Sequence, residues 1–240
     1  MPAIRLETRR IEKPWGRRPL WPGFEDVAPG GVPVGEIWFE DPRGGEPELL
    51  VKYLFTAEKL SVQVHPDDAT ARAAGYARGK DEAWFILDAE PHATIGPGTV
   101  HAIGAGVTLV EVQQNVDLTY RLYDYGRPRE LHLDAGIAVS DPVPWVVPFV
   151  PVEAGQGRVI AADGPAFVLE HWTCSGNGRM KSDGRPIWLV PTKGEGRIDG
   201  ARFAPGGVWI VEDEAGLELG PGSDMLVAYP GQGVIAAIWQ

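Results

Sequence analysis

Apolar and polar residues alternate with a period of two along most of the 240-residue chain. β-Branched and aromatic residues dominate these runs, and Gly-rich or Pro-rich turns separate them, a pattern typical of β-strands. In the first half of the chain we expect strands at residues 49–55, 60–65, 82–88, 107–114 and 117–125. The one clear helix candidate follows His65, with Asp68 as the predicted N-cap and Gly79 marking its end.

The second half of the chain has a different sequence pattern. Residues 141–160 contain four prolines among apolar residues, which predicts an extended connector rather than a central strand. Short strands are expected beyond it, at residues 167–174, 186–191, 206–213 and 224–230. Strands at this spacing favour a sandwich or a small barrel. We therefore predict a mainly all-β fold with a first module at 1–140, the connector, and a smaller second module at 161–240.

Composition narrows the class of protein. The net charge is −11 and no tract is rich in Lys and Arg, which argues against nucleic-acid binding. The start of the chain has no apolar signal core, and no stretch of 18 residues is continuously apolar, so we expect no membrane segment. Cys174 is the single cysteine, so no internal disulfide can form. We expect a cytoplasmic protein, either a monomer or a homodimer.

A set of polar residues within these strands suggests a site. Gln63 and His65 are two residues apart on a predicted strand, so both side chains project from the same face. Glu82 lies on another strand, and His101 follows a Pro-Gly turn. Two imidazoles, a carboxylate and an amide oxygen form a donor set that suits zinc or a similar divalent ion.

Each of these residues also has a simpler interpretation. His65 alone is more often a structural histidine, Glu82 alone a solvated charge at a strand edge, and His101 alone a turn residue. His92 is a reserve ligand because it lies close to His101 in sequence. Only the joint pattern favours a metal, and we expect none in the second module.

Four segments make the chain similar to a known family. They are LSVQVHPDD (60–68), KDEAWFIL (80–87), PGTVHAIGAG (97–106) and EVQQNVDLTYRLYDYGR (111–127). In this order they resemble the type I phosphomannose isomerases, which are zinc-dependent cupins. The resemblance runs from about Glu12 to residue 134.

This resemblance implies a cupin, or jelly-roll, β-barrel in the first module and a cupin-like second module. It also implies one Zn²⁺ per chain, held by Gln63, His65, Glu82 and His101. The implied reaction is the metal-dependent interconversion of mannose 6-phosphate and fructose 6-phosphate, an aldose–ketose isomerisation.

Further positions match residues of the family's active site. Lys80, Glu111, Asp117 and Arg121 match catalytic positions. Ser61 and Arg127 match positions that hold the sugar phosphate, and these two assignments rest only on the resemblance. The residues themselves leave one alternative open for Arg121, a structural ion pair with Asp117, since both project from one face of a strand.

The chain departs from the family in one segment. Only 18 residues separate Glu82 from His101, where the family usually has several dozen. Either residues 92–95 form the strand that leads to His101, or a segment is missing near Gly96. The short segment keeps a second hypothesis open, a catalytically impaired or non-catalytic cupin that binds metal and sugar phosphate. An iron-dependent oxygenase is disfavoured because Gln63 is an unusual ligand for that class.

Overall fold

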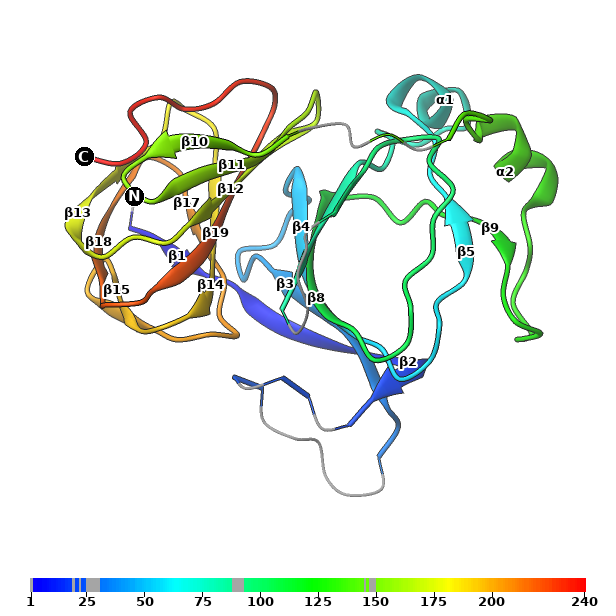
Figure 1. Cartoon of the computed structure of the whole chain (residues 1–240), viewed down its shortest axis with the longest axis horizontal. Helices are drawn as coiled ribbons and strands as arrows, with labels where there is room; N and C mark the ends of the chain where they lie inside the picture. Colours follow the sequence, from blue (N-terminus) through cyan, green and yellow to red (C-terminus); the bar gives the residue numbers. More distant parts are fainter. Residues whose placement is uncertain are drawn as a thin grey trace.

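The computed structural model of the chain describes residues 2–18, 20–21, 23–24, 31–87, 93–144, 146 and 150–240. Strands far outnumber helices, which confirms the prediction of a mainly β fold. Figure 1 shows two β-rich lobes side by side. The first lobe comprises the described residues between 7 and 139, and the second lobe comprises residues 152–240 together with strand β1 (Ile4–Arg5). Within the described residues, no helix combines the length and the apolar character needed to cross a membrane.

A six-stranded antiparallel sheet forms one side of the first lobe, in the order β2-β3-β4-β8-β6-β7. Its strands are β2 (Glu7–Arg17), β3 (Val34–Glu40), β4 (Leu49–Phe55), β6 (Glu82–Ile86), β7 (Ala93–Ile95) and β8 (Thr108–Gln114). A two-stranded sheet pairs β5 (Val62–Val64) with β9 (Tyr120–Tyr123). This pair lies opposite β4 and β8 in Figure 1, so the two sheets form opposite sides of a barrel.

Strand β4 shows how one sequence pattern serves both faces of the large sheet. All seven of its residues are buried. Val51, Tyr53 and Phe55 belong to a hydrophobic core on the outer face of the sheet. Lys52 and Leu54 line a cavity on the inner face. Because both faces are covered, the strand is a nearly continuous apolar run, and Lys52 is the exception that marks the cavity side.

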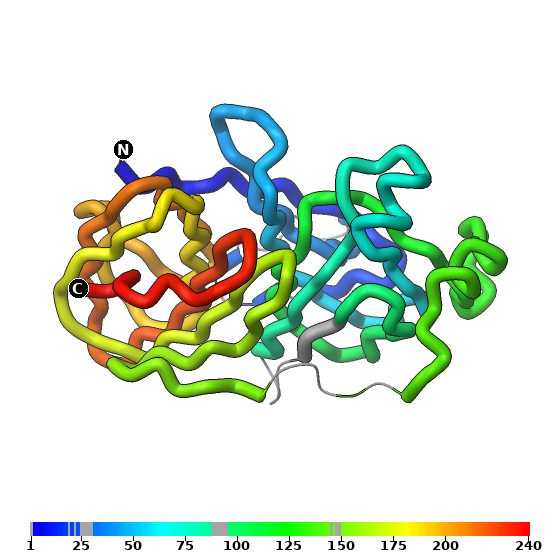
Figure 2. The backbone as a smooth tube through the Cα atoms, turned by 90° about the horizontal axis from the view of Figure 1, so that it is seen from above, coloured from blue at the N-terminus to red at the C-terminus, as the bar shows by residue number. Residues whose placement is uncertain are grey.

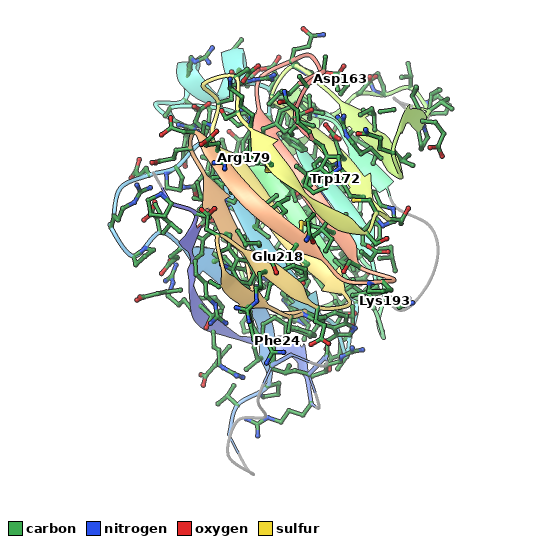
Figure 3. The ribbon with its side chains drawn as sticks, turned by 90° about the vertical axis from the view of Figure 1, so that its left-hand side faces the viewer. Phe24, Asp163, Trp172, Arg179, Lys193 and Glu218 are labelled. Carbon is green, nitrogen blue, oxygen red and sulfur yellow. The ribbon has the colours of Figure 1, made fainter. Side chains whose placement is uncertain are left out.

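Two sheets form the second lobe. The first is a seven-stranded sheet, in the order β1-β17-β14-β19-β12-β11-β10, and the second is a four-stranded sheet, in the order β13-β18-β15-β16. The former contains, besides β1, the strands β10 (Val152–Gly155), β11 (Arg158–Asp163), β12 (Phe167–Trp172), β14 (Ile187–Lys193), β17 (Trp209–Val211) and β19 (Asp224–Pro230). The latter contains β13 (Gly176–Lys181), β15 (Gly196–Ile198), β16 (Ala201–Phe203) and β18 (Glu214–Leu219). Figure 3 views this lobe from the outside, with Arg179 and Glu218 on the four-stranded sheet.

The seven-stranded sheet is covered on both faces. One hydrophobic core, which includes Trp172 and Met180, fills the space between it and the four-stranded sheet. The other core joins the two lobes, because Tyr53 of the first lobe and Phe167 and Trp188 of the second belong to it. Burial of apolar side chains at such an interface is the main favourable term in folding. The second lobe therefore covers the outer face of the sheet that carries the cavity.

Polypeptide segments also connect the lobes. Strand β1 pairs with β17 of the second lobe, and β2 follows it almost directly and pairs with β3 of the first lobe. The bend between β3 and β4, seen in light blue in Figure 2, stands out from the rest of the chain. Arg43 on this bend forms an ion pair with Glu212 of the second lobe at 2.9 Å. Strand β10 and the start of β11 come from the segment predicted as a connector, so that segment is extended but partly hydrogen-bonded into the sheet.

Two short helices lie in the first lobe, α1 (Asp68–Ala73) and α2 (Leu133–Val139). The prediction of Asp68 as the N-cap of α1 is wrong by one residue. Asp67 has the extended backbone of a cap, and its side chain accepts a hydrogen bond from the Thr70 backbone N–H at 2.7 Å. The helix also ends at Ala73, well before Gly79. Helix α2 was not predicted, since its N-cap makes no side-chain hydrogen bond and its sequence contains a glycine.

Candidate active site

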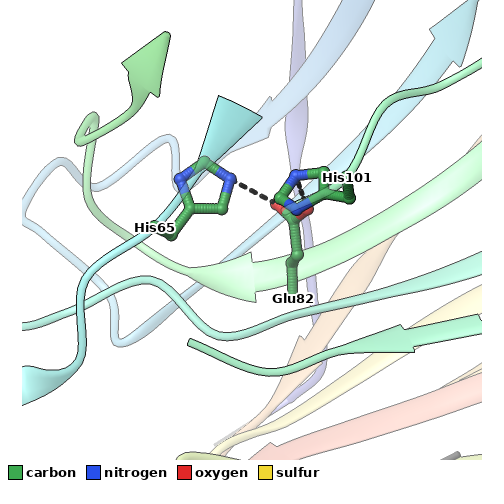
Figure 4. Close-up of side chains that lie close together, drawn as sticks. All are labelled: His65, Glu82 and His101. Carbon is green, nitrogen blue, oxygen red and sulfur yellow. Dashed lines mark ion pairs between the residues drawn. The ribbon is translucent and has the colours of Figure 1, made fainter. Parts of the chain in front are cut away.

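Three of the four predicted metal ligands converge inside the first lobe (Figure 4). His65 follows strand β5, Glu82 begins β6, and His101 forms an isolated bridge with Gln63. One donor atom from each of the three side chains lies within 4.8 Å of the others. The Nε2 atoms of His65 and His101 lie 3.4 Å and 3.1 Å from the Glu82 carboxylate. Among the described residues, no other group of three or more His, Cys, Asp or Glu side chains is arranged in this way.

Backbone carbonyls fix the orientation of both imidazoles. The Nδ1 atom of His65 lies 2.9 Å from the carbonyl oxygen of Leu118, and that of His101 lies 2.8 Å from the carbonyl oxygen of Thr99. Since a carbonyl only accepts, each Nδ1 carries the proton and donates. The Nε2 lone pairs then face Glu82, and each has a donor close by, the Lys80 ammonium 3.4 Å from His65 and the Gln63 amide nitrogen 3.2 Å from His101. A hydrogen bond from the ring nitrogen that faces away from the metal, as Nδ1 makes here, is usual for metal-binding histidines.

The charges in the cluster also suit a cation. Glu82 has no exposed surface, and neither of its carboxylate oxygens accepts a hydrogen bond of good geometry. Burial alone would raise the pKa of Glu82, but the charge of Lys80, whose Nζ lies 2.9 Å away, and the interactions with His65 and His101 together outweigh burial and hold the pKa well below its usual range. Burial, and then the charge of Lys80, lowers the pKa of His65, so its imidazole is neutral. A neutral imidazole and an ionised carboxylate are the forms that bind a metal.

Gln63, the fourth predicted ligand, lies beside the cluster on β5. Its backbone N–H and C=O both pair with His101, at 2.9 Å each. Its amide nitrogen donates to Nε2 of His101 at 3.2 Å, and its Oε1 accepts from the Ser61 hydroxyl at 3.3 Å, so a half-turn of the amide would bring the oxygen to the cluster. The set of two nitrogens, one carboxylate and one amide oxygen fits a divalent ion such as zinc, and the Glu82 oxygens without hydrogen bonds supply acceptor capacity for it.

The described residues 93–100 lead from a strand through a turn to His101. Residues 93–95 form strand β7, which pairs with β6 and places Ile95 opposite Glu82. A turn with positive φ at Gly98 follows, and the Gly98 N–H donates to the His65 carbonyl at 2.9 Å. The first of the two sequence interpretations, an approach strand close to residues 92–95, is therefore confirmed for 93–95. His92 itself lies outside the described residues.

A cavity of about 370 Å³ lies beside the cluster on the inner face of the large sheet. Its lining includes six of the predicted site residues, namely Ser61, Gln63, Lys80, Glu111, Asp117 and Arg121. His65, Glu82 and His101 are not part of this lining. They lie directly behind Gln63 and Lys80, which contact both them and the cavity.

Arg121 is poorly satisfied by the protein. One of its terminal nitrogens donates to the Glu130 carbonyl at 2.9 Å, whereas its buried Nε has no hydrogen-bond partner. Burial, and then the nearby charge of Arg129, lowers its pKa. Asp117 opposes this through its charge, but among the described residues no carboxylate lies within ion-pair distance of Arg121. The alternative of a structural ion pair with Asp117 is therefore not what the structure shows.

Arg127 has a different environment. It forms ion pairs with Asp124 at 3.0 Å and with Glu58 at 2.8 Å, and it donates to the Lys59 carbonyl at 2.9 Å. It is absent from the cavity lining, to which Arg129 contributes instead. The structure thus brings Ser61 to the cavity but leaves Arg127 at its outside, held by contacts of its own.

Several lining residues were missed by sequence reasoning. They come from the three strands at the far side of the large sheet and are Arg9, Lys13, Glu36, Trp38 and Lys52. The Lys52 ammonium lies 2.6 Å from the Gln113 amide oxygen and 3.2 Å from Glu111. A lone lysine at the centre of an apolar strand is a signal of such a site, because a buried lysine needs a partner.

The two other described histidines and the cysteine lie apart from the cluster. His132 accepts a hydrogen bond from the Arg121 backbone N–H at 3.2 Å. His171 of the second lobe pairs with Asp224 at 2.7 Å. Burial raises the pKa of Cys174, which makes its thiol a poor nucleophile.

Comparison with known proteins gives a consistent result. No protein-family profile matches the chain. Mannose-6-phosphate isomerase ManA of Bacillus subtilis (strain 168) is 31% identical over 224 residues, and the match covers 70% of each chain. The crystal structure of the mannose 6-phosphate isomerase from Bacillus subtilis has a TM-score of 0.80 at 22% identity, over 95% of this chain and 99% of that one. A mannose 6-phosphate isomerase solved with zinc bound has a TM-score of 0.68 at 14% identity, over 96% and 100% of the chains.

The two structural likenesses, at these low identities, show the fold, and the sequence relationship shows the family. The order of the four motifs, the His-Glu-His cluster and the cavity beside it agree with both. The chain belongs to the mannose-6-phosphate isomerase family.

Proposed function

We propose that the protein interconverts mannose 6-phosphate and fructose 6-phosphate in a metal-dependent reaction. The observation that carries the proposal is the position of the His65, Glu82 and His101 cluster, directly behind a cavity lined by both carboxylates and cations. The family relationship names the reaction, and the cavity supplies groups that can perform it. Nothing in the described part of the chain favours the alternative of a non-catalytic sugar-phosphate-binding protein.

The metal would be zinc, held by His65, Glu82, His101 and the amide oxygen of Gln63. A bound zinc ion supplies electrophilic polarisation of the sugar carbonyl and stabilises negative charge on the enediolate. The protein's own contribution is to keep both imidazoles neutral and aligned through the Leu118 and Thr99 carbonyls.

We assign proton transfer to Glu111 and Lys80. Isomerisation removes the proton from C2 of the open-chain aldose and returns a proton to C1, while the hydroxyl proton moves from O2 to O1. Glu111 and Lys80 line the cavity as one carboxylate and one ammonium, and both are buried. Burial excludes water from the reacting carbons and strengthens the interactions of these groups with developing charge.

Arg121 stabilises the negative charge that develops in the reaction. Its buried Nε lacks a partner, so an anionic substrate gives it an interaction that the protein does not. Asp117, which lines the same cavity, orients it through its charge.

The phosphate group meets Ser61 in the cavity lining. Arg127 can reach it only by leaving Glu58 or Asp124, since both carboxylates hold its guanidinium. We propose that this exchange of partners accompanies substrate binding. The enzyme would work in the cytoplasm, as a monomer or a homodimer, with no nucleic-acid partner.

A coupled assay tests the proposal. Purified protein of known metal content is supplied with mannose 6-phosphate, and fructose 6-phosphate is detected. We expect turnover that a chelator abolishes and zinc restores. Stoichiometric zinc without turnover would refute the enzymatic function. Oxygen consumption with iron-loaded protein is the control for the oxygenase class, and we expect none.

A further inference from the structure

One row of side chains crosses the large sheet from its edge to the metal cluster. The strand registers pair Arg9 of β2 with Trp38 of β3, Trp38 with Lys52 of β4, Lys52 with Glu111 of β8, and Glu111 with Trp84 of β6. Directly paired residues on one face of an antiparallel sheet lie close enough for their side chains to interact. Along the row the side chains are, in order, a cation, an aromatic ring, a cation, a carboxylate and an aromatic ring.

Every neighbouring pair in the row is in contact. The Arg9 guanidinium lies 4.6 Å and the Lys52 ammonium 4.8 Å from the centre of the Trp38 ring. Lys52 lies 3.2 Å from one oxygen of Glu111, and the Trp84 indole N–H donates to the other at 3.2 Å. The Trp84 ring in turn lies 5.3 Å from that of His101, at a steep angle.

Trp38 is itself held in place. Its indole N–H donates to Glu36 at 2.6 Å, and Glu36 forms an ion pair with Lys13 at 3.1 Å. Glu36 is buried, so this hydrogen bond is partly shielded from water. The ring therefore has a fixed position against which a flexible lysine side chain can rest.

Lys52 depends on such a support. Its ammonium group is buried, and its partners are Gln113, Glu111 and the face of the Trp38 ring. The two hydrogen-bonding partners both belong to β8, and on the side of β3 the Glu36 carboxylate acts on the ammonium through its charge without a hydrogen bond. The ring of Trp38, on the other neighbouring strand, closes the opposite side with its negative face.

We infer that Trp38 is a positioning residue that holds the Lys52 ammonium against the Glu111 carboxylate. The inference rests on the proposed function where it concerns turnover, since Glu111 is there assigned to proton transfer. Its structural content, the placement of Lys52 by the aromatic face of Trp38, is independent of any reaction.

The variants distinguish the effect of the aromatic face from the effect of side-chain volume. Trp38→Leu removes the face, whereas Trp38→Phe keeps a face but loses the hydrogen bond to Glu36. Ile103→Ala is the matched control, because Ile103 is a buried apolar residue of the same cavity lining outside the row. All variants are compared as zinc-loaded protein with equal metal content.

The first readout does not need turnover. Lysines are reductively methylated with formaldehyde and cyanoborohydride, and the rate at Lys52 is followed by peptide mass spectrometry. We expect Trp38→Leu to raise this rate about tenfold, a change of the size a buried cation–π contact supports. Trp38→Phe should stay within about threefold of wild type, and Ile103→Ala should not change it.

The second readout is steady-state kinetics with mannose 6-phosphate. We expect kcat to fall about tenfold or more in Trp38→Leu with KM within about threefold, and Trp38→Phe to recover most of kcat. Wild-type labelling of Lys52 in Trp38→Leu would overturn the inference, as would equal labelling in the Phe and Leu variants. If Trp38→Leu does not fold, Trp38→Met replaces it. A wild-type protein without turnover would refute the proposed function and leave the labelling result to decide on Trp38.

Discussion

Replacement of Glu82 by glutamine tests the metal cluster at its most buried group. The change keeps the shape of the side chain and removes its charge. Two unit charges 2.9 Å apart, as for Lys80 and Glu82, interact by about 6 kcal/mol at an effective dielectric constant of about 20. Desolvation of the two charges offsets part of this attraction. Removing one partner leaves the other charge buried and uncompensated, which costs about 3–5 kcal/mol. We expect a decrease of that size in the unfolding free energy of the metal-free protein.

The same substitution should weaken zinc binding. Loss of a group behind a metal ligand costs about 10–100-fold in affinity, and we expect Glu82→Gln, at the ligand itself, to cost at least about 100-fold. Glu170→Gln is the matched control. Glu170 is equally buried and paired with Arg158 at 2.9 Å, but it lies in the second lobe. It should destabilise the fold by a similar amount without altering zinc affinity.

Two measurements decide the outcome. Urea unfolding of metal-free protein gives the stability change, and competition with a chromogenic chelator gives the zinc dissociation constant. If Glu82→Gln bound zinc as tightly as Glu170→Gln does, Glu82 would not be a ligand. If Glu82→Gln left the metal-free protein as stable as wild type, the ion pair with Lys80 would contribute nothing net.

Three more predictions follow from the structure. Arg121→Gln should retain stoichiometric zinc while kcat falls by about 100-fold or more, whereas near-normal kinetics would remove Arg121 from catalysis. Phe167→Ala should cost about 3–5 kcal/mol through a cavity in the core that joins the lobes. Fluorescence and circular dichroism should show one shared transition in that variant, and separate transitions would contradict a common core. Asp124→Asn should cost about 1–2 kcal/mol at pH 7, because hydrogen bonds from Arg129 and Arg127 outweigh burial and lower the pKa of Asp124 below its ordinary 3.8. This stabilisation is complete above pH 3.8 and is lost as the pH falls through the lowered pKa of Asp124. The difference in unfolding free energy between wild type and Asp124→Asn should therefore shrink by about pH 3. An unchanged difference would exclude this cause.

Much of the strand pattern could be predicted from local sequence. The strands predicted at residues 49–55 and 224–230 match β4 and β19 at both ends, since each is a run of apolar residues between clear turn signals. Strands β2 and β3 were missed. Strand β2 is mostly exposed and rich in charge, so its sequence lacks the apolar alternation that marks a strand.

The site could be predicted only in part, for a related reason. Gln63 and His65 share a strand, so their common direction follows from local geometry. The row of Arg9, Trp38 and Lys52 arises from the pairing of three strands, and pairing registers are not visible in a single sequence. His101 became a candidate from its place after a Pro-Gly turn, and the family resemblance supported it. It could not show that Arg127 is held by Glu58, because that contact depends on how two distant turns meet.

The pairing of β1 with β17 has a consequence for the time course of folding. Ile4 pairs with Ile210, so a strand made early has its partner made about two hundred residues later. At a synthesis rate of about 5–20 residues per second, the wait is roughly 10–40 s. During that interval β1 is an unpaired edge directly preceding the strand that carries Arg9 and Lys13. The seven-stranded sheet of the second lobe therefore gains its β1 strand late, after the strands of the active-site sheet have been made, and until then β1 is an exposed edge that needs protection from aggregation.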